Sequence, residues 1–362
     1  MYYTLQDFDF TLPNDLIAKT PNYQRSTSRL LVYNNNAIED DYFQNIISRF
    51  HKGDLIILND SKVIKSRIIL PSNIDLYIKE FISEKIDNNR NITDVVAICY
   101  AKPAKKLAIG DIFHFDDHII QIINKLDDGT VKVTMELINK SIYEFLEEYG
   151  SMPLPPYMKR KVPDKKDDEY YQTVYAKYEG SIAAPTAGLH FSTEIIDALK
   201  AKGVEIKFIT LHVGAGTFLP IKTNNILEHK MHSEKVSLNV ELLELINKKK
   251  QEGKNVIAVG TTVIRALESV FMHNINHVYN KCVSNIYTFD TDIFIKPGFV
   301  FKSANILLTN FHLPKSTLVI LISAFAGHNV VRLAYPHAIK HGYKFFSYGD
   351  ATLLYIQTKS IV

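Results

Sequence analysis

The apolar and polar positions divide the chain into stretches of different texture. Residues 53–57, GDLII, are an apolar run after a turn glycine, which is typical of a buried strand. Between residues 69 and 140, strand-like runs recur at short intervals, at 76–82, 95–101, 111–115, 118–126 and 131–137. Asp127, Asp128 and Gly129 form a hairpin signal within this stretch. The pattern predicts a small antiparallel unit, which we interpret as a barrel.

A helix and a proline-rich segment bound this β-rich stretch. Ser141 with Glu144 three residues later is a capping box, and Gly150 is a helix stop. Three prolines in residues 152–157, MPLPPY, exclude a helix and favour extended chain. The β-rich stretch should therefore end near residue 150.

From residue 192 onward, predicted helices and strands alternate. Ser192 and Thr193 can cap a helix that ends at Gly203, and residues 204–213 read as a strand. A helix over 241–253, a strand over 256–260 and a helix starting at 261, capped by Thr261 or Thr262, follow. This order is typical of a parallel α/β sheet, where ligands bind at the carboxyl ends of strands. We therefore expect a site in the loops after residues 213, 259 and 308.

Composition excludes several classes of protein. The 362 residues suggest about two domains, and 46% hydrophobic with 22% charged residues is globular composition. The longest apolar run, residues 317–327, is shorter than the roughly 20 residues of a membrane span and should be a core element. The N-terminal residues lack the pattern of a secretory signal, so we expect a cytoplasmic protein. Cys99 and Cys282 lie far apart, which argues against a disulfide framework or a zinc ribbon.

The charge pattern permits only a local nucleic-acid surface. A net charge of +3 is too small for a protein that coats nucleic acid. Lys62 and Arg67 follow a predicted strand, and Lys159, Arg160 and Tyr171 belong to a stretch of mixed basic and aromatic residues. Such stretches suit single-stranded RNA, because cations meet phosphate and rings stack on bases. A solvated loop and a charged linker are the alternatives.

Two similar segments are candidates for a ligand site. Residues 180–191, GSIAAPTAGLHF, and 210–218, TLHVGAGTF, combine Gly, Ala and Thr with one His, so that backbone groups and hydroxyls can approach a ligand closely. The second lacks the third glycine of a dinucleotide fingerprint, and the chain has no P-loop motif. We therefore expect neither a Rossmann cofactor nor an NTP-hydrolysing site.

Several polar residues could carry chemistry. His229 and His232, close to Glu234, could bind a metal, but a further well-spaced ligand is not evident. We therefore expect His232 and Glu234 to be acid–base or hydrogen-bonding groups, with a surface loop as the alternative. His312 follows a predicted strand with Asn310, which favours a pocket over a random loop, with a structural hydrogen-bonding histidine as the alternative. For Arg265 and Glu268, three apart on a helix, an ion pair is the simplest alternative.

In chain order these motifs resemble the S-adenosylmethionine:tRNA ribosyltransferase-isomerase family of queuosine biosynthesis. The resemblance runs through DFDFTLP, MPLPPY, YQTVYA, GSIAAPTAGLHF, LHVGAGTF, HKMHSE, VGTTVIRALES, IKPGFVF, LLTNFHLPKSTL, SAFAG and FFSYGDA. It implies an α/β main domain, mostly parallel with flanking helices, from residues 1–68 plus 152–362. An antiparallel β-barrel domain is expected as an insertion at 69–151.

The resemblance also implies a reaction and its partners. S-adenosylmethionine would be the co-substrate, with no prosthetic group and no metal. Its ribosyl moiety would be transferred to 7-aminomethyl-7-deazaguanine at the tRNA wobble position and isomerised, giving epoxyqueuosine, adenine and methionine. The protein should be a cytoplasmic monomer without a membrane contact. A tRNA-binding adaptor and an ordinary methyltransferase are the alternatives.

The family motifs supply the candidates for catalysis and for binding S-adenosylmethionine, and the basic and aromatic stretches described above supply those for binding tRNA. The acid–base candidates are His190, His212, His232, Glu234 and His312. The candidates for binding S-adenosylmethionine are Thr186, Gly188, Phe191, Gly214, Gly216, Thr217, Thr261, Thr262, Arg265 and Asn310, with the Phe191 ring as a face for the sulfonium. The tRNA-binding candidates are Lys62, Arg67, Lys159, Arg160 and Tyr171.

Overall fold

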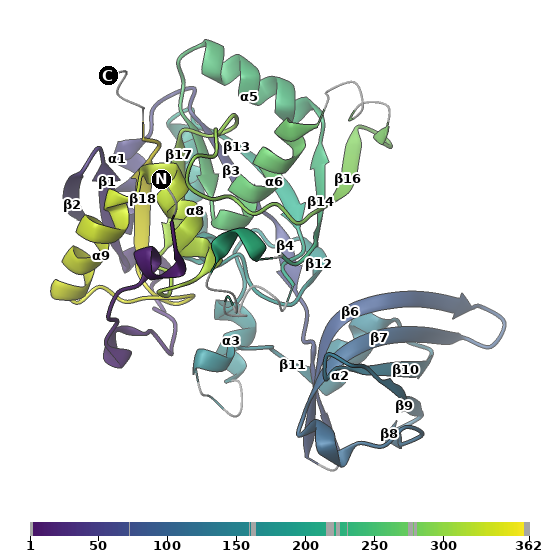
Figure 1. The fold of residues 1–362 in the computed structure, drawn as a ribbon. Helices are drawn as coiled ribbons and strands as arrows, with labels where there is room; N and C mark the ends of the chain where they lie inside the picture. The colour runs from purple at the N-terminus through teal and green to yellow at the C-terminus, as the bar shows by residue number, and fades with distance from the viewer. Residues whose placement is uncertain are drawn as a thin grey trace.

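The computed structural model describes residues 3–71, 73–158, 160, 164–214, 221, 225–229, 231–273, 278 and 281–357. A nine-stranded sheet forms the larger part (Figure 1). Its strands, in spatial order, are β16 (Ile286–Thr291), β14 (Glu234–Asn239), β13 (Glu205–Leu211), β3 (Leu55–Asn59), β15 (Val256–Val259), β17 (Ile306–Asn310), β18 (Ala351–Tyr355), β1 (Arg29–Asn34) and β2 (Ala37–Tyr42).

The sheet is mixed, so the expectation of a mostly parallel sheet is not confirmed. Strands β13, β3, β15 and β17 run parallel to one another, and β18 runs parallel to β1. The β16–β14, β14–β13, β17–β18 and β1–β2 pairs are antiparallel. Helices α8 (Thr317–Ala326) and α9 (Asn329–Lys340) both lie between β17 and β18 in the chain, whereas a parallel crossover usually has one helix. Strand β18 runs antiparallel to β17. The buried run ATLLY of β18 is apolar whichever way the strand points, so the sequence does not reveal its direction.

Helices cover both faces of this sheet because its strands are apolar on both sides. Leu30, Ile56 and Leu58 pack on the face of α1 (Ile46–Arg49) and α4 (Thr193–Ala201). Leu31 and Leu55 point to the opposite face, which α5 (Glu241–Gln251), α6 (Thr261–Met272), α8 (Thr317–Ala326) and α9 (Asn329–Lys340) cover. The result is a three-layer α/β domain.

A second, antiparallel sheet lies apart from the first (Figure 1). Its order is β11 (Gly150–Ser151), β5 (Arg67–Leu70), β6 (Ile74–Asp87), β7 (Ile92–Lys102), β10 (Val131–Ile138), β9 (His118–Lys125) and β8 (Ile112–Phe115). The sheet is curled, with β11 and β8 at its edges, and resembles half a barrel. Helix α2 (Ile142–Tyr149) has the predicted Ser141–Glu144 capping box. The two separate sheets are compatible with a two-domain architecture in which the half-barrel is the smaller unit.

Short elements join the two parts. Strands β4 (Ser61–Val63) and β12 (Tyr178–Ser181) pair in parallel, and α3 (Lys165–Tyr170) lies in the segment between the half-barrel and β12. The 3-10 turns are η1 (Leu5–Phe8), η2 (Asn14–Leu16), η3 (Arg25–Thr27), η4 (Phe43–Asn45), η5 (Ala104–Lys106), η6 (Pro156–Met158), η7 (Thr186–His190) and η9 (Ile226–Glu228).

The apolar run at residues 317–327 forms α8, which is mostly buried, as predicted. Within the described ranges, no single helix has the length and apolarity to cross a membrane. Helices α8 and α9 meet that criterion only as a pair bent by 111°.

Candidate active site

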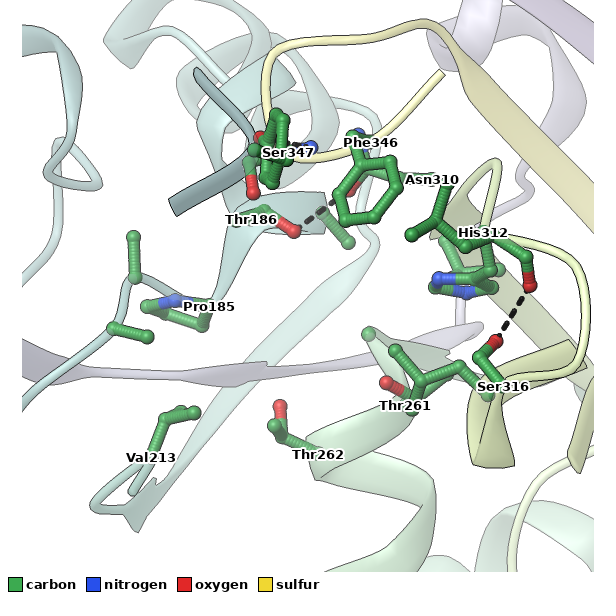
Figure 2. Close-up of a pocket in the computed structure, with 18 of the residues that line it drawn as sticks. Pro185, Thr186, Val213, Thr261, Thr262, Asn310, His312, Ser316, Phe346 and Ser347 are labelled. Carbon is green, nitrogen blue, oxygen red and sulfur yellow. Dashed lines mark hydrogen bonds between the residues drawn. The ribbon is translucent and has the colours of Figure 1, made fainter. Parts of the chain in front are cut away.

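A cavity of about 340 Å³ opens at the carboxyl ends of β15 and β17 (Figure 2). Its volume lies within the roughly 300–1,000 Å³ of small-molecule pockets. Described residues from all three regions expected from the strand order line it, namely Val213, Gly260 with the next two residues, and Thr309 with Asn310. Among the described residues the lining comprises Leu5, Tyr157, Ala183, Ala184, Pro185, Thr186, Ala187, Val213, Ile221, Gly260, Thr261, Thr262, Thr309, Asn310, His312, Leu313, Pro314, Lys315, Ser316, Leu318, Phe346 and Ser347.

The first turn of α6 forms one polar wall of the cavity. Gly260 is the N-cap residue, with φ of 95°, and its N–H donates to the carbonyl of Leu308 at 2.7 Å. The expectation that Thr261 or Thr262 caps this helix is wrong, because both lie inside its first turn. Among the residues that the structure describes, the buried Oγ1 of Thr262 has no hydrogen-bond partner, and Thr262 lines the cavity (Figure 2). A bound ligand can supply the missing partner.

His312 forms a second polar wall. Its Nε2 lies 3.0 Å from Oγ1 of Thr309, and its backbone N–H donates to the hydroxyl of Tyr335 at 3.2 Å. Burial lowers the pKa of His312 to about 3, so the imidazole is neutral at pH 7. A neutral imidazole can still donate or accept a hydrogen bond.

Thr186 and Asn310 meet on a third side. The hydroxyl of Thr186 donates to Oδ1 of Asn310 at 3.0 Å (Figure 2). Behind Asn310, its Nδ2 lies 3.1 Å from Nε2 of His190, and Nδ1 of His190 lies 2.8 Å from Oγ of Ser28. Burial, followed by the charge of Arg25, lowers the pKa of His190 to about 4. His190 is thus a neutral ring behind the cavity wall rather than part of its lining.

Glu234 and Arg265 form a buried ion pair beside the site. Arg265 donates from one terminal nitrogen to Oε2 of Glu234 and from Nε to the carbonyl of Ile293 at 3.3 Å. Oε1 of Glu234 accepts from the N–H of Gly214 at 3.3 Å. The alternative of an Arg265–Glu268 pair is wrong, because Glu268 instead accepts from backbone N–H groups of residues 302 and 303. The pair therefore ties α6 to β14 and to the loop after β13.

Comparison with known proteins agrees with this architecture. The sequence model of the family described as "Queuosine biosynthesis protein" matches residues 5–354. The chain belongs to this family. A Rickettsia bellii S-adenosylmethionine:tRNA ribosyltransferase-isomerase is 49% identical over 360 residues, covering 97% of this chain and 99% of the relative. The Rickettsia felis protein of the same name is 47% identical over 381 residues, with the same coverage.

The fold resembles a solved member of the family. The crystal structure of S-adenosylmethionine tRNA ribosyltransferase from Thermotoga maritima matches with a TM-score of 0.53 and 30% identity. The match covers 96% of this chain and 99% of that one.

Not every histidine in the family motifs lies at the cavity. The ring of His212 packs over Gly180, where an added Cβ would lie 2.8 Å from its Nδ1. Burial lowers the pKa of His212, whose Nδ1 has no partner within the described part of the chain. His232 is exposed, and the ring of His229 contacts Phe294 with centroids 5.5 Å apart. No group of three His, Cys, Asp or Glu side chains suited to a metal occurs among the residues that the structure describes.

Two residues of the GSIAAPTAGLHF motif serve packing. Gly188 leaves room for Tyr175, because an added Cβ would lie 2.0 Å from the Tyr175 hydroxyl oxygen. Phe191 is fully buried and packs edge-on against Phe43, with centroids 5.1 Å apart. Its ring therefore cannot face a bound sulfonium in this arrangement. The candidates Gly216 and Thr217 lie outside the described residues.

The side chains expected to bind tRNA are engaged within the protein. Lys62 pairs with Glu179 at 2.9 Å, Arg67 with Asp75 at 2.9 Å, and Arg160 with Asp167 at 2.7 Å. Tyr171 has no exposed surface and packs against Tyr348, with centroids 5.8 Å apart. Lys159 lies outside the described residues. Carboxylates thus pair with the three described cations and the core covers the Tyr171 ring, and the binding of tRNA by these residues stays a prediction.

Sequence reasoning missed the apolar part of the site. Pro185, Leu313, Pro314 and Phe346 give the cavity apolar walls, and Figure 2 shows the rings of Pro185 and Phe346. Pro185 and Phe346 lie in the GSIAAPTAGLHF and FFSYGDA motifs. Their place in motifs of the family resemblance is the sequence signal that could have pointed to them.

Proposed function

We propose that this chain transfers the ribosyl moiety of S-adenosylmethionine to tRNA and isomerises it. The acceptor is the amine of 7-aminomethyl-7-deazaguanine at the wobble position, and the products are epoxyqueuosine-tRNA, adenine and methionine. Membership of the queuosine biosynthesis family over residues 5–354 carries this proposal. Relatives at 46–49% identity bear the name S-adenosylmethionine:tRNA ribosyltransferase-isomerase, and each is covered over 99% of its length.

The cavity is the proposed site for S-adenosylmethionine. Of the ten candidates for binding this co-substrate, Thr186, Thr261, Thr262 and Asn310 line it. Its apolar walls suit a purine ring, and its hydroxyl, amide and imidazole groups suit the polar edges of a nucleoside. S-adenosylmethionine is consumed as a co-substrate, so the proposal needs no prosthetic group.

The reaction asks for proton transfers close to the ligand. The sulfonium acidifies the adjacent ribose carbon, adenine leaves more readily when a donor meets its nitrogen, and the attacking amine must be neutral. His312 is the histidine that lines the cavity within the described ranges, and we assign it the contact with the departing base. Its neutral imidazole acts there as a hydrogen-bonding group, because its low pKa excludes a protonated ring at pH 7.

Glu234, His212 and His232 stand apart from the cavity lining, and their roles are proposed accordingly. Glu234 holds Arg265 and the backbone of Gly214, so we assign it to positioning the loop after β13. His212 and His232 stay candidates for proton transfer at the tRNA side of the reaction. We also propose that the chain acts as a monomer in the cytoplasm.

One assay separates this function from its alternatives. The protein is incubated with S-adenosylmethionine and a tRNA bearing 7-aminomethyl-7-deazaguanine, and small-molecule products are analysed. Adenine and methionine in equal amounts support the proposal, whereas S-adenosylhomocysteine indicates a methyltransferase. Binding of tRNA without turnover indicates an adaptor. The same tRNA with unmodified guanine is the control and should give no adenine.

A further inference from the structure

Four side chains form a continuous hydrogen-bonded relay from the protein interior to the cavity. It runs from Ser28 through His190 and Asn310 to Thr186, with contacts of 2.8, 3.1 and 3.0 Å. Ser28, His190 and Asn310 are buried, with exposed fractions of 6%, 5% and 2%. Only Thr186 and Asn310 reach the cavity, so the other two act from behind its wall.

The orientation of the Asn310 amide sets the direction of the relay, because Oδ1 accepts from the Thr186 hydroxyl and Nδ2 faces Nε2 of His190, and the contact at Ser28 agrees with it. The hydroxyl of Ser28 donates to the backbone carbonyl of Arg25 at 3.4 Å, and a carbonyl can only accept. Oγ of Ser28 then accepts from Nδ1–H of His190, which leaves Nε2 of the neutral ring as an acceptor. Nε2 accepts from Nδ2 of Asn310, and Oδ1 of Asn310 turns toward Thr186.

Thr186 therefore has its only hydroxyl proton engaged. That proton lies on the hydrogen bond to Oδ1 of Asn310, so Oγ1 offers only lone pairs to the cavity. In the opposite relay direction, Nδ2 of Asn310 would donate to Thr186, whose hydroxyl would then donate into the cavity. The tautomer of the neutral His190 ring thus sets the hydrogen-bonding polarity of a residue that it does not touch.

The charges that line the cavity limit which group of S-adenosylmethionine can donate a hydrogen bond to Thr186. S-adenosylmethionine offers donors at its ammonium group, its ribose hydroxyls and the 6-amino group of adenine. The part of the lining that the structure describes contains no Asp or Glu, and its one lysine, Lys315, pairs with Asp9 at 2.8 Å. An ammonium group would lack a counter-charge there. A ribose hydroxyl can bond to Thr186 whether the threonine hydroxyl donates or accepts toward the cavity. The neutral amino group only donates, so it requires an acceptor.

We propose that Thr186 accepts a hydrogen bond from the 6-amino group of adenine and that His190 is the positioning residue that makes Thr186 an acceptor. This assignment rests on the proposed function, since it takes S-adenosylmethionine as the ligand. It makes Thr186 a specificity-determining residue. A 6-oxo purine would place a carbonyl oxygen against the lone pairs of Thr186 and be rejected.

The test compares S-adenosylmethionine with its 6-oxo analogue, in which hypoxanthine replaces adenine. Equilibrium binding to the free protein and kcat/KM with the modified tRNA are measured for both ligands. The unsubstituted protein should prefer the 6-amino ligand about 10- to 100-fold, because the analogue leaves two acceptors facing each other. Thr186→Val, which keeps the shape and removes the oxygen, should lower this preference at least about fivefold. Thr186→Ser, which keeps the hydroxyl, should retain it.

The role of His190 is tested by the same preference for the 6-amino over the 6-oxo ligand. His190→Leu removes the acceptor, frees the amide of Asn310 to rotate, and should lower the preference about as much as Thr186→Val. His190→Gln restores an acceptor oxygen and should recover it. Thermal unfolding of each variant shows whether the fold persists, and a purely structural role would change the unfolding temperature without changing the preference.

The outcomes separate this inference from the proposed function. If the unsubstituted protein releases no adenine, the function itself is wrong. If it is active but shows no preference for the 6-amino ligand, or if Thr186→Val keeps the full preference, Thr186 does not read the amino group. If the folded His190→Leu variant keeps the preference for the 6-amino ligand while Thr186→Val loses it, His190 does not make Thr186 an acceptor.

Discussion

Replacing Glu234 with Gln tests whether this carboxylate is structural or takes part in proton transfer. Glu234 and Arg265 are buried, with side-chain exposed fractions of 4% and 6%. One carboxylate oxygen accepts from Arg265 and the other from the N–H of Gly214 at 3.3 Å. Glutamine has nearly the same shape and one acceptor oxygen, but it leaves the guanidinium charge uncompensated.

The expected loss of stability follows from burial. Removing one partner of a buried ion pair costs roughly 3–5 kcal/mol, because the remaining charge stays out of water. Glutamine keeps part of the hydrogen bonding, so we expect the lower end, about 3 kcal/mol. At roughly 2 °C per kcal/mol for a domain of this size, the unfolding temperature should fall by about 6 °C. Arg265→Met in the Glu234→Gln background should recover part of the loss, because the unpaired charge is then absent.

Urea and thermal unfolding measure this effect in the two single variants and the double variant. A coupling free energy of about 2 kcal/mol or more in the resulting cycle supports a structural pair. Proton transfer by Glu234 predicts a different result, a roughly 100- to 10,000-fold fall in kcat with stability nearly unchanged. That result would refute the positioning role.

Three further changes have distinct expected outcomes. Gly188→Ala should destabilise the protein by about 1–3 kcal/mol, since the new Cβ would lie 2.0 Å from the Tyr175 hydroxyl. The same change in a Tyr175→Phe background should cost clearly less. Equal losses of stability in urea unfolding of the two backgrounds would contradict the packing account. The pKa values of His190 and His312 in the folded protein are about 4 and about 3, whereas an unfolded histidine has a pKa near 6.5. Below about pH 6.5 the unfolded chain therefore binds more protons than the folded protein. The contribution of these two neutral histidines to the free energy of unfolding should be complete above about pH 6.5 and fall as the pH drops toward 4. Urea midpoints of the unsubstituted protein that stay constant over this pH range would contradict this prediction. Thr262→Val should leave the stability unchanged or raised, because its hydroxyl has no partner among the described residues. The same change should weaken S-adenosylmethionine binding about 2- to 10-fold by calorimetry, and unaltered affinity would exclude Thr262 from the ligand contacts.

The sequence reveals the elements of the fold better than their directions. Local signals predicted the half-barrel strands and the caps at Ser141 and Ser192, because capping and alternation depend on neighbouring residues. Strand direction depends on how the chain returns between elements. Strand β18 is therefore recognisable as a buried strand, while its antiparallel pairing with β17 is not.

The polar part of the site was predictable, whereas the partners of its residues were not. Thr186, Asn310 and His312 stand in motifs at strand ends, and the structure brings them together. His190 has the same sequence signature, but its ring is held by Ser28, 162 residues away in the chain. Arg67 likewise looks like a free cation until folding places Asp75 beside it across the β5–β6 pair. Pairings of this kind arise from tertiary structure, which residue types alone do not encode.

The most direct test of the proposed function follows the carbon atoms of S-adenosylmethionine. The co-substrate is prepared with ¹³C throughout its ribose and ¹⁴C in its methyl group, and is incubated with the protein and a tRNA bearing 7-aminomethyl-7-deazaguanine. After digestion of the tRNA, mass spectrometry should find all five ribose carbons on the wobble nucleoside, with the ¹⁴C recovered as free methionine. Methyl label in the tRNA, or a wobble nucleoside without the ribose carbons, would contradict the account.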